Sequence, residues 1–253
     1  MPDKKIKISI VNYFNTLPFR FGIKNSDIVN KIELQEDIPS ICAQKLKFKQ
    51  VEIGLVPVAL LPELDNYKII TNYCIGANGK VDSVKLYSEA PMDEIKSITL
   101  DYQSKSSIKL TKVLSKFYWK KNFEFKDAKP GYEQQIKGTN AAVVIGDRTF
   151  ALNGTFKHEF DLAEEWKKMT SLPFVFAAWV TTSEIDSAFI TEFNKALESG
   201  IENVNEAIKQ SNSMPSGKFN ALDYLTNKIS YKLDDRKLEG MNLFLKYISQ
   251  LNS

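Results

Sequence analysis

Polar side chains follow three apolar runs of the chain, at the points where buried strands are expected to end. In chain order they are Asn15 and Thr16, then Ser104, Ser106 and Ser107, and finally Asp147 after Gly146. Hydroxyl groups and free backbone N–H groups at the start of a helix favour the binding of an anion. The pattern therefore predicts a site for a small anion where these segments meet.

Each of these residues also has a purely structural interpretation. Serine is a preferred residue at the start of a helix, although one cap accounts for only one of the three serines between 104 and 107. Asp147 precedes a predicted helix and is a candidate cap as well. Asn15 taken alone is typical of a turn. Spacing by itself leaves both interpretations open.

The sequence shows no motif that is typical of a nucleotide site or of a metal site. The sequence contains no GxGxxG and no GxxxxGK[ST] motif. Cys42 and Cys74 lie far apart without CxxC spacing, so buried free thiols are expected. His158 is the only histidine and is expected at the surface, whereas zinc clusters and Ser-His-Asp triads need more, or better placed, histidines. We therefore expect a cleft that works without a metal or a cofactor.

Apolar runs and alternating patterns predict the elements that position these residues. Strands are expected at 6–11, 32–34, 51–57, 67–75, 81–87, 95–100, 123–125, 141–146 and 174–180. Helices are expected within 12–20, from 39 onward, at 104–120 and 130–137, in the charged stretch before Ser171, and along the apolar stripes 190–208 and 238–248. Strands that alternate with helices indicate an α/β fold with mixed, mostly parallel sheets flanked by helices.

The alternation occurs in two sets, which indicates two lobes. Residues 1–88 and 174–253 would form the first lobe and 89–173 the second, with crossings near Ser88–Pro91 and Leu172–Pro173. The apolar run 174–180, which follows a charged helix and a Ser-Leu-Pro break, is typical of a strand in a parallel sheet. Ligands of open α/β sheets bind at the carboxyl ends of the strands, so a cleft between the lobes is the expected site.

Composition excludes several classes of partner. The 253 residues include 34 basic and 31 acidic side chains, for a net charge of +3, which gives no reason to expect nucleic acid. No apolar stretch reaches 18 residues, so we expect no membrane span. The first ten residues carry lysines without a long apolar core after them, so a cytoplasmic location is expected. No obligatory protein partner is evident.

Several parts of the sequence together resemble chorismate dehydratase, the enzyme that opens the futalosine route to menaquinone. Ile10–Phe19 is similar to its Asn-Tyr-Leu-Asn-Thr-x-Pro motif, and Val51–Val58 to its Val-Asp-Ile-Gly-Leu-Val-Pro-Val block. Ala141–Asp147 and Asp161–Trp179 resemble its Ile-Gly-Asp and Glu-Trp-x-x-x-Thr-Gly-Leu-Pro-Phe-Val-Phe-Ala blocks, and Ser104–Ser107 resembles its Ser-Arg-Thr-Ser. The resemblance runs from about Ile8 to Val180, and the helical tail carries little signal.

The resemblance implies a two-lobed fold like that of type II periplasmic binding proteins. It implies conversion of chorismate to 3-[(1-carboxyvinyl)oxy]benzoate by loss of water, without a metal or cofactor. Asn15 is the candidate catalytic residue, as a hydrogen-bonding partner of the reacting hydroxyl or the side chain of the substrate. The proton acceptor stays open, and a substrate carboxylate is one candidate. The expected substrate-binding residues are Thr16, Val56, Pro57, Ser83, Ser104, Ser106, Ser107, Gly146 and Asp147.

The sequence departs from this family's pattern at a few positions. Ser171 stands where the family has Gly, while Lys105 and Ser106 replace Arg and Thr and so retain a cation and a hydroxyl. The sister enzyme 1,4-dihydroxy-6-naphthoate synthase is the nearest alternative, but it has a Ser-Pro-type opening and a histidine where Gly146 stands here. A small-anion binding protein without catalysis is the alternative from another class, because fold alone does not distinguish binding from turnover.

Overall fold

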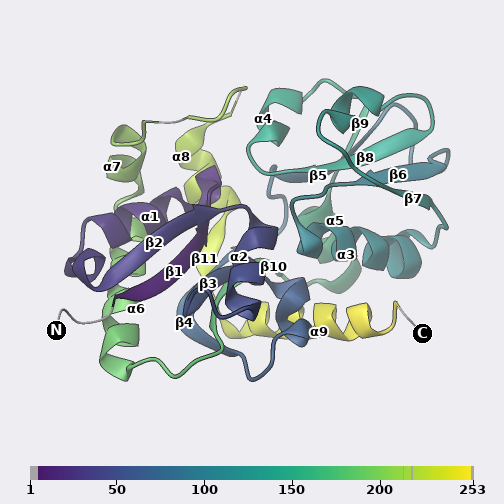
Figure 1. Ribbon diagram of the computed structural model, residues 1–253. Helices are drawn as coiled ribbons and strands as arrows, with labels where there is room; N and C mark the ends of the chain where they lie inside the picture. Colours follow the sequence, from purple (N-terminus) through teal and green to yellow (C-terminus); the bar gives the residue numbers. More distant parts are fainter. Residues whose placement is uncertain (1–4, 213, 218, 252–253) are drawn as a thin grey trace.

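The strands of the computed structural model, which describes residues 5–212, 214–217 and 219–251, form two separate sheets (Figure 1). The six-stranded sheet has the order β11-β4-β10-β3-β1-β2, and the five-stranded sheet has the order β7-β6-β8-β5-β9. The first consists of β1 (Ile6–Val11), β2 (Ile32–Asp37), β3 (Ile53–Pro57), β4 (Lys68–Ala77), β10 (Phe174–Thr181) and β11 (Ser230–Lys232). The second consists of β5 (Val84–Ser88), β6 (Ser97–Leu100), β7 (Glu124–Asp127), β8 (Asn140–Ile145) and β9 (His158–Asp161).

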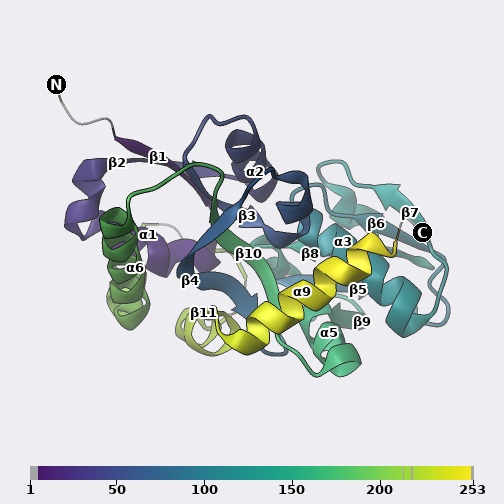
Figure 2. The ribbon, with the colours of Figure 1, turned by 90° about the horizontal axis from the view of Figure 1, so that it is seen from below.

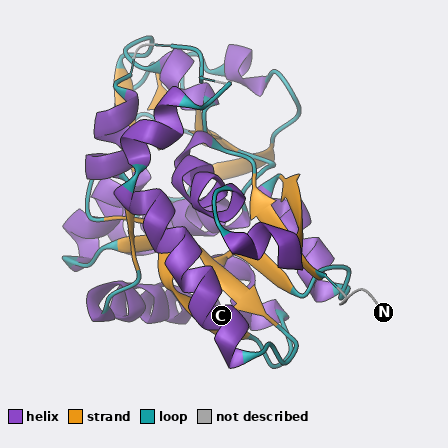
Figure 3. Ribbon diagram, turned by 90° about the vertical axis from the view of Figure 1, so that its left-hand side faces the viewer, coloured by secondary structure: helices purple, strands orange, loops and turns teal. Residues whose placement is uncertain are grey.

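Helices cover both sheets (Figure 3). They are α1 (Leu17–Lys24), α2 (Pro39–Lys47), α3 (Lys105–Val113), α4 (Arg148–Leu152), α5 (Leu162–Thr170), α6 (Ser187–Glu202), α7 (Val204–Lys209), α8 (Ala221–Asp223) and α9 (Asp235–Ser249). Helix α9 contacts β10 of one sheet and α3 beside the other, and Figure 2 shows it lying across both parts of the molecule. Within the described residues, no helix is both long and apolar enough to cross a membrane.

Both sheets are mixed and the α/β prediction is confirmed, but the expectation of mostly parallel pairing is wrong, because antiparallel pairs outnumber parallel ones. Strands β1–β2, β1–β3, β6–β7 and β6–β8 pair in parallel, whereas the other pairs are antiparallel. One continuous core extends from Ile8 in the first sheet to Ile98 in the second. A second, smaller cluster gathers around Tyr87 and Tyr132 on the five-stranded sheet. This continuity means that apolar packing joins the two sheets as well as stabilising each of them.

The expected parallel pairing of residues 174–180 is wrong. Strand β10 pairs antiparallel with both neighbours, so that Ala178 lies opposite Val56 of β3 and Cys74 of β4. Every residue of β10 is buried, because the strand lies inside the sheet and has packed layers on both faces. The continuous apolar run at 174–180 therefore indicates that both faces of the strand are buried. Such a run carries no information on the direction of the strand.

The first expected crossing between the lobes is also wrong. Residues 84–88, which the sequence analysis places with the first lobe, form β5 and pair with β8 and β9 of the five-stranded sheet. The chain therefore passes between the sheets at residues 78–83, after β4 and before β5. Gly79 and Asp82 in this segment have positive φ angles of 119° and 64°, and such positions mark turns. The Pro91 region follows β5 and lies beyond this passage.

Short elements account for most of the remaining differences. Strands β9 and β11 were not expected, because His158–Asp161 has no apolar run and Ser230–Lys232 is only 3 residues long. Where a helix was expected at 130–137, the structure has a 3₁₀ turn, Tyr132–Gln135. The helix expected at 104–120 is divided into α3 and a π-helical segment that follows it, Leu114–Trp119. Both cysteines are buried and free, as expected, whereas His158 is only partly exposed.

Candidate functional site

A cavity lies between the two sheets, at the ends of strands from both. About 520 Å³ of space without atoms lies here, and part of that space is open solvent. Val11 and Pro57 end strands of the six-stranded sheet and form one side of the wall, while Ile145 ends β8 on the other side. The carboxyl ends of parallel strands converge here because β1 and β3 pair in the same direction.

The cavity wall contains most of the residues predicted to form the site. Those that line it are Asn15, Pro57, Ser83, Ser104, Ser107 and Gly146. The remaining wall is mainly apolar, with Phe176 and Ile75 among its members, and no described wall residue carries a formal charge. In the part of the chain that the structure describes, no group of three or more His, Cys, Asp or Glu side chains is arranged to hold a metal ion. Binding in this cavity therefore depends on uncharged donors and apolar contact.

Ser104 caps helix α3 and faces the cavity as well. Its Oγ accepts hydrogen bonds from the Ser107 backbone N at 3.2 Å and from the Ser107 hydroxyl at 3.1 Å. The first N–H groups of a helix have no partner within the helix, and the helix dipole is positive at this end. The capping interpretation is confirmed for Ser104, yet both hydroxyls also line the cavity. This end of the cavity is suited to a carboxylate.

Four other predicted residues do not line this cavity. The Ser106 hydroxyl accepts from the Ala59 N at 3.2 Å and donates to the Phe176 carbonyl at 3.0 Å, so it joins α3 to the six-stranded sheet. The Thr16 hydroxyl donates to the carbonyls of Val11 and Tyr13 at 2.6 and 2.8 Å. Val56 is fully buried within β3. These three residues hold the walls in place from behind.

Asp147, the fourth, joins the two sheets by a different route. Both of its carboxylate oxygens accept from the Phe14 backbone N at 3.1 Å, and its side chain makes no cap bond to α4. The expected capping role is therefore wrong. Burial raises the pKa of Asp147, while the Phe14 hydrogen bond and the charge of Arg20 act against that shift. Asp147 lines a neighbouring cavity, which has Tyr13 in its wall in common with the first.

Asn15 presents an unpartnered amide oxygen. The residue lies in a 3₁₀ turn, Phe14–Thr16, directly after β1, and its Oδ1 is buried without a hydrogen-bond partner in the described part of the chain. Leaving a buried acceptor unpaired costs about 1–3 kcal/mol. The Asn15 main-chain carbonyl, in contrast, accepts from the Tyr231 hydroxyl at 2.9 Å. The backbone is thus fixed while the side-chain oxygen is left for an occupant of the cavity.

Gly146 and Tyr13 form a close contact between the two sheets. Gly146 has φ 69°, and a Cβ on it would come within 3.0 Å of the Tyr13 ring. The Tyr13 hydroxyl donates to Gln103 Oε1, and burial is the main cause that raises the pKa of Tyr13 well above its usual value. Tyr13 was not predicted as a wall residue, although it stands inside the Asn12–Asn15 motif, which could have pointed to it.

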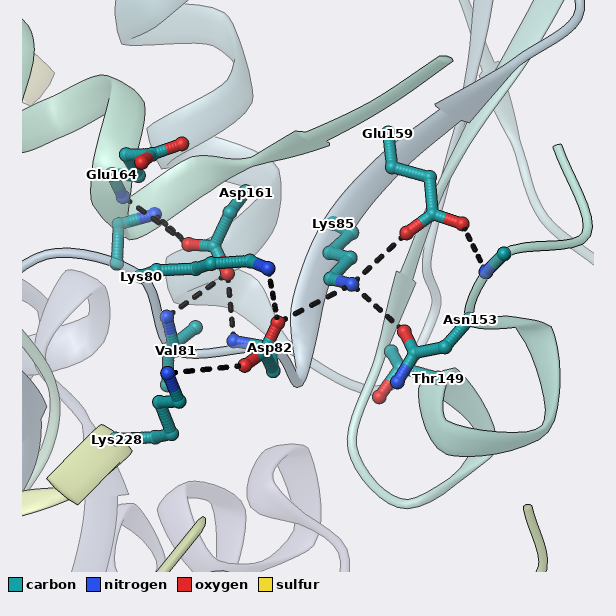
Figure 4. Close-up of polar contacts among 12 residues, drawn as sticks. Lys80, Val81, Asp82, Lys85, Thr149, Asn153, Glu159, Asp161, Glu164 and Lys228 are labelled. Carbon is teal, nitrogen blue, oxygen red and sulfur yellow. Dashed lines mark hydrogen bonds and ion pairs between the residues drawn. The ribbon is translucent and has the colours of Figure 1, made fainter. Parts of the chain in front are cut away.

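A cluster of charged groups lies behind the part of the cavity wall that Val81 forms (Figure 4). Asp161 accepts from the backbone N atoms of Val81 and Asp82 at 2.9 and 2.7 Å, which anchors the segment that crosses between the sheets. Buried Lys85 contacts Asn153 at 2.8 Å, Glu159 at 3.0 Å and Asp82 at 3.4 Å. Val81 lines the cavity itself. The cluster therefore holds a wall of the cavity without exposing a charge to it.

Comparison with known proteins identifies a family. A model of a protein family described as menaquinone biosynthesis matches residues 6–250, nearly the whole chain. That description names the pathway and no particular reaction. The match agrees with the resemblance seen in the sequence motifs.

Solved structures confirm the expected fold. Protein AF1704 from Archaeoglobus fulgidus has a TM-score of 0.70 at 14% identity, covering 98% of this chain and 96% of that chain. The Candida albicans CA3427 gene product, described as having the generic periplasmic binding protein fold, has a TM-score of 0.65 at 13% identity, with coverages of 99% and 92%. The alkanesulfonate-binding protein SsuA from Xanthomonas axonopodis pv. citri, bound to MOPS, has a TM-score of 0.66 at 11% identity, with coverages of 100% and 94%. Identities this low show the fold alone.

Proposed function

Because this chain belongs to the menaquinone-biosynthesis family, we propose that it is a chorismate dehydratase. The reaction converts chorismate to 3-[(1-carboxyvinyl)oxy]benzoate and water. A ring C–H bond and the neighbouring C–O bond break, the hydroxyl leaves with the proton as water, and the ring becomes aromatic. The gain of aromaticity supplies the driving force, so the protein has to hold one conformer, assist the departing hydroxyl and exclude bulk water.

Two sets of polar residues in the cavity wall suit the polar parts of this substrate. Ser104 and Ser107 at the start of α3 offer hydroxyl groups and helix N–H groups for a carboxylate. Asn15 offers its amide to the reacting hydroxyl or to the enolpyruvyl side chain. The apolar wall residues, which include Phe176 and Ile145, offer the ring a surface for packing. The meeting of Tyr13 and Asn15 with Ser104 and Ser107 in one cavity that has no charged residue among its described wall residues is the observation that carries the proposal.

The proton acceptor is proposed to come from the substrate. No Asp, Glu, His or Lys lies among the described residues that line the cavity. A general base must lie within hydrogen-bonding reach of the proton it takes. A carboxylate of the bound chorismate meets that requirement without a side chain of the protein. In this proposal the cavity selects the conformer in which that carboxylate approaches the ring hydrogen.

Incubation of the purified protein with chorismate tests the proposal. The expected product has lost one water and absorbs as a substituted benzoate, and it should form equally after treatment with EDTA. A matched incubation with Asn15→Ala protein separates catalysis from the slow uncatalysed decay of chorismate. Binding of chorismate without turnover would instead support an anion-binding protein, and activity that is lost to EDTA and restored by a metal would contradict the proposed mechanism.

A further inference from the structure

We propose that Tyr224, in the C-terminal part of the chain, is a positioning residue that sets the hydrogen-bonding direction of Ser83 in the cavity. The inference rests on the proposed function for its effect on turnover, but its geometry stands independently. The Tyr224 hydroxyl donates to Ser83 Oγ at 2.8 Å, and Ser83 lines the cavity. The two residues are 141 positions apart in the sequence.

Aromatic contacts on two sides hold the Tyr224 ring. Tyr224 is 3% exposed and begins a π-helical segment, Tyr224–Lys228. Its ring packs edge-on against Phe150 with centroids 4.9 Å apart, and lies nearly parallel to Phe14 at 6.3 Å. Phe14 and Phe150 belong to segments beside different sheets. A rigid donor at this junction fixes the Ser83 rotamer from behind the cavity wall.

The number of donors and acceptors then determines where the Ser83 hydroxyl proton points. A serine hydroxyl has one proton and accepts through its lone pairs. Because Tyr224 donates its proton to Ser83 Oγ, the Ser83 proton is left to point elsewhere, and the residue faces the cavity. Ser83 therefore acts as a donor toward an acceptor oxygen of the occupant. Without the phenol hydroxyl, the serine would be free to rotate and to use its proton in other bonds.

Asn15 is linked to the same tyrosine. Burial raises the pKa of Tyr224, and interactions with the Ser83 hydroxyl and the Asn15 side-chain amide act against that shift. Asn15 Oδ1 itself is buried without a hydrogen-bond partner in the described part of the chain. The hydrogen bond from Tyr224 to Ser83 is the contact through which the tyrosine acts on the cavity wall. A π-helical segment at such a position is consistent with the frequent occurrence of these segments at functional sites.

A double-mutant cycle with Tyr224→Phe and Ser83→Ala tests the inference. Phenylalanine keeps the ring contacts and removes only the hydroxyl. We expect Tyr224→Phe to lower kcat about 5–10-fold, as for the loss of one hydrogen bond. The double variant should be no worse than Ser83→Ala alone, because the tyrosine acts through the serine. Independent, multiplicative losses in kcat would overturn the proposal, as would wild-type kcat in Tyr224→Phe.

Tyr87→Phe is the matched control. Tyr87 is also a fully buried tyrosine, and its hydroxyl donates to the Thr149 carbonyl at 3.2 Å, away from the cavity wall. This substitution should lower the melting temperature by a similar amount and leave kcat unchanged. Equal losses of kcat in both variants would show that any missing buried hydroxyl impairs the protein, and would overturn a positioning role for Tyr224.

A binding measurement separates this inference from the proposed reaction. Isophthalate, an aromatic dicarboxylate, is titrated into the wild type and into the Tyr224→Phe, Ser83→Ala and double variants. Non-additive losses of affinity without any turnover of chorismate would support the positioning role while contradicting the proposed function. Turnover of chorismate together with additive losses of isophthalate affinity would support the proposed function and contradict the positioning role. A wild-type protein that neither binds isophthalate nor turns over chorismate would overturn both.

Discussion

The cavity and the charged cluster beside it differ in how completely their polar side chains are hydrogen-bonded. In the cluster of Figure 4, Lys85 has three oxygen partners, and Asp161 accepts four backbone hydrogen bonds, from residues 81, 82, 163 and 164. In the cavity, Asn15 Oδ1 has no partner among the described residues. Charged side chains here are used for structure, and uncharged polar side chains are kept available for a ligand.

A physical reason underlies this division. A charge taken out of water must be compensated, so a buried lysine or aspartate is stable only with a full set of partners. A single unpaired amide oxygen costs far less and is satisfied once a ligand arrives. The comparison predicts that substitutions in the cluster reduce stability, while substitutions in the cavity reduce activity. The following variants test that separation, from the largest expected effect to the smallest.

Asn15→Ala should lower kcat by about 10²-fold or more, the loss seen when a hydrogen bond to the transition state is removed. The melting temperature should change little, because the amide oxygen has no partner to lose. Steady-state kinetics with chorismate and a thermal melt measure the two quantities. Asn12→Ala is the matched control, since Asn12 lies in the same loop but lines the neighbouring cavity. A wild-type kcat in Asn15→Ala would return Asn15 to the role of a turn residue.

Asp161→Ala should lower the free energy of unfolding by about 2–4 kcal/mol, because buried N–H groups lose their acceptor. The bonds to Val81 and Asp82 also anchor the crossing segment. Chemical denaturation measures the change. Asp186→Ala is the control, because Asp186 caps α6 through one bond to Phe189 N at 3.0 Å and should cost about 1 kcal/mol. Equal losses in the two variants would show that Asp161 is only a helix cap.

Ser107→Ala should raise KM about 5–10-fold, because it removes the hydroxyl that donates to Ser104 Oγ and that thereby leaves the Ser104 proton free for the carboxylate. Ser106→Ala should instead lower the melting temperature with little change in KM, since Ser106 bonds only to Ala59 and Phe176 in the described structure. The two serines are adjacent, so the pair is a sensitive test of which one faces the ligand. A higher KM in Ser106→Ala with an unchanged KM in Ser107→Ala would reverse the assignment.

Lys228→Ala should have the smallest effect, within about 0.5 kcal/mol of unfolding free energy, as for other ion pairs near the surface. Its Nζ lies 3.8 Å from Asp82 and 4.0 Å from Asp223, and about a third of its side chain is exposed. KM should stay unchanged, because Lys228 does not line the cavity. Titration of KM against salt is the second measurement. A large rise in KM, reduced by salt, would mean that the cluster attracts the anionic substrate.

The sequence predicted the local parts of the site well. The Asn12–Asn15 motif, the cap at Ser104 and the buried strand before Gly146 are all patterns within a few residues, and all lie where the strands end. It did not distinguish Ser106 from Ser107. Successive residues of a helix point about 100° apart, so the choice depends on how α3 packs. That packing is set by Ala59 and Phe176, which lie far away in the chain.

The sequence alone determined the α/β class, the alternation of strands and helices, and the polar residues at the strand ends, because these follow from side-chain patterns over short stretches. Only the tertiary structure decided the antiparallel direction of β10, the transfer of β5 to the second sheet and the support of Asn15 and Ser83 by Tyr231 and Tyr224. These features join residues up to 216 positions apart. They depend on which buried surfaces meet, and no local pattern records that.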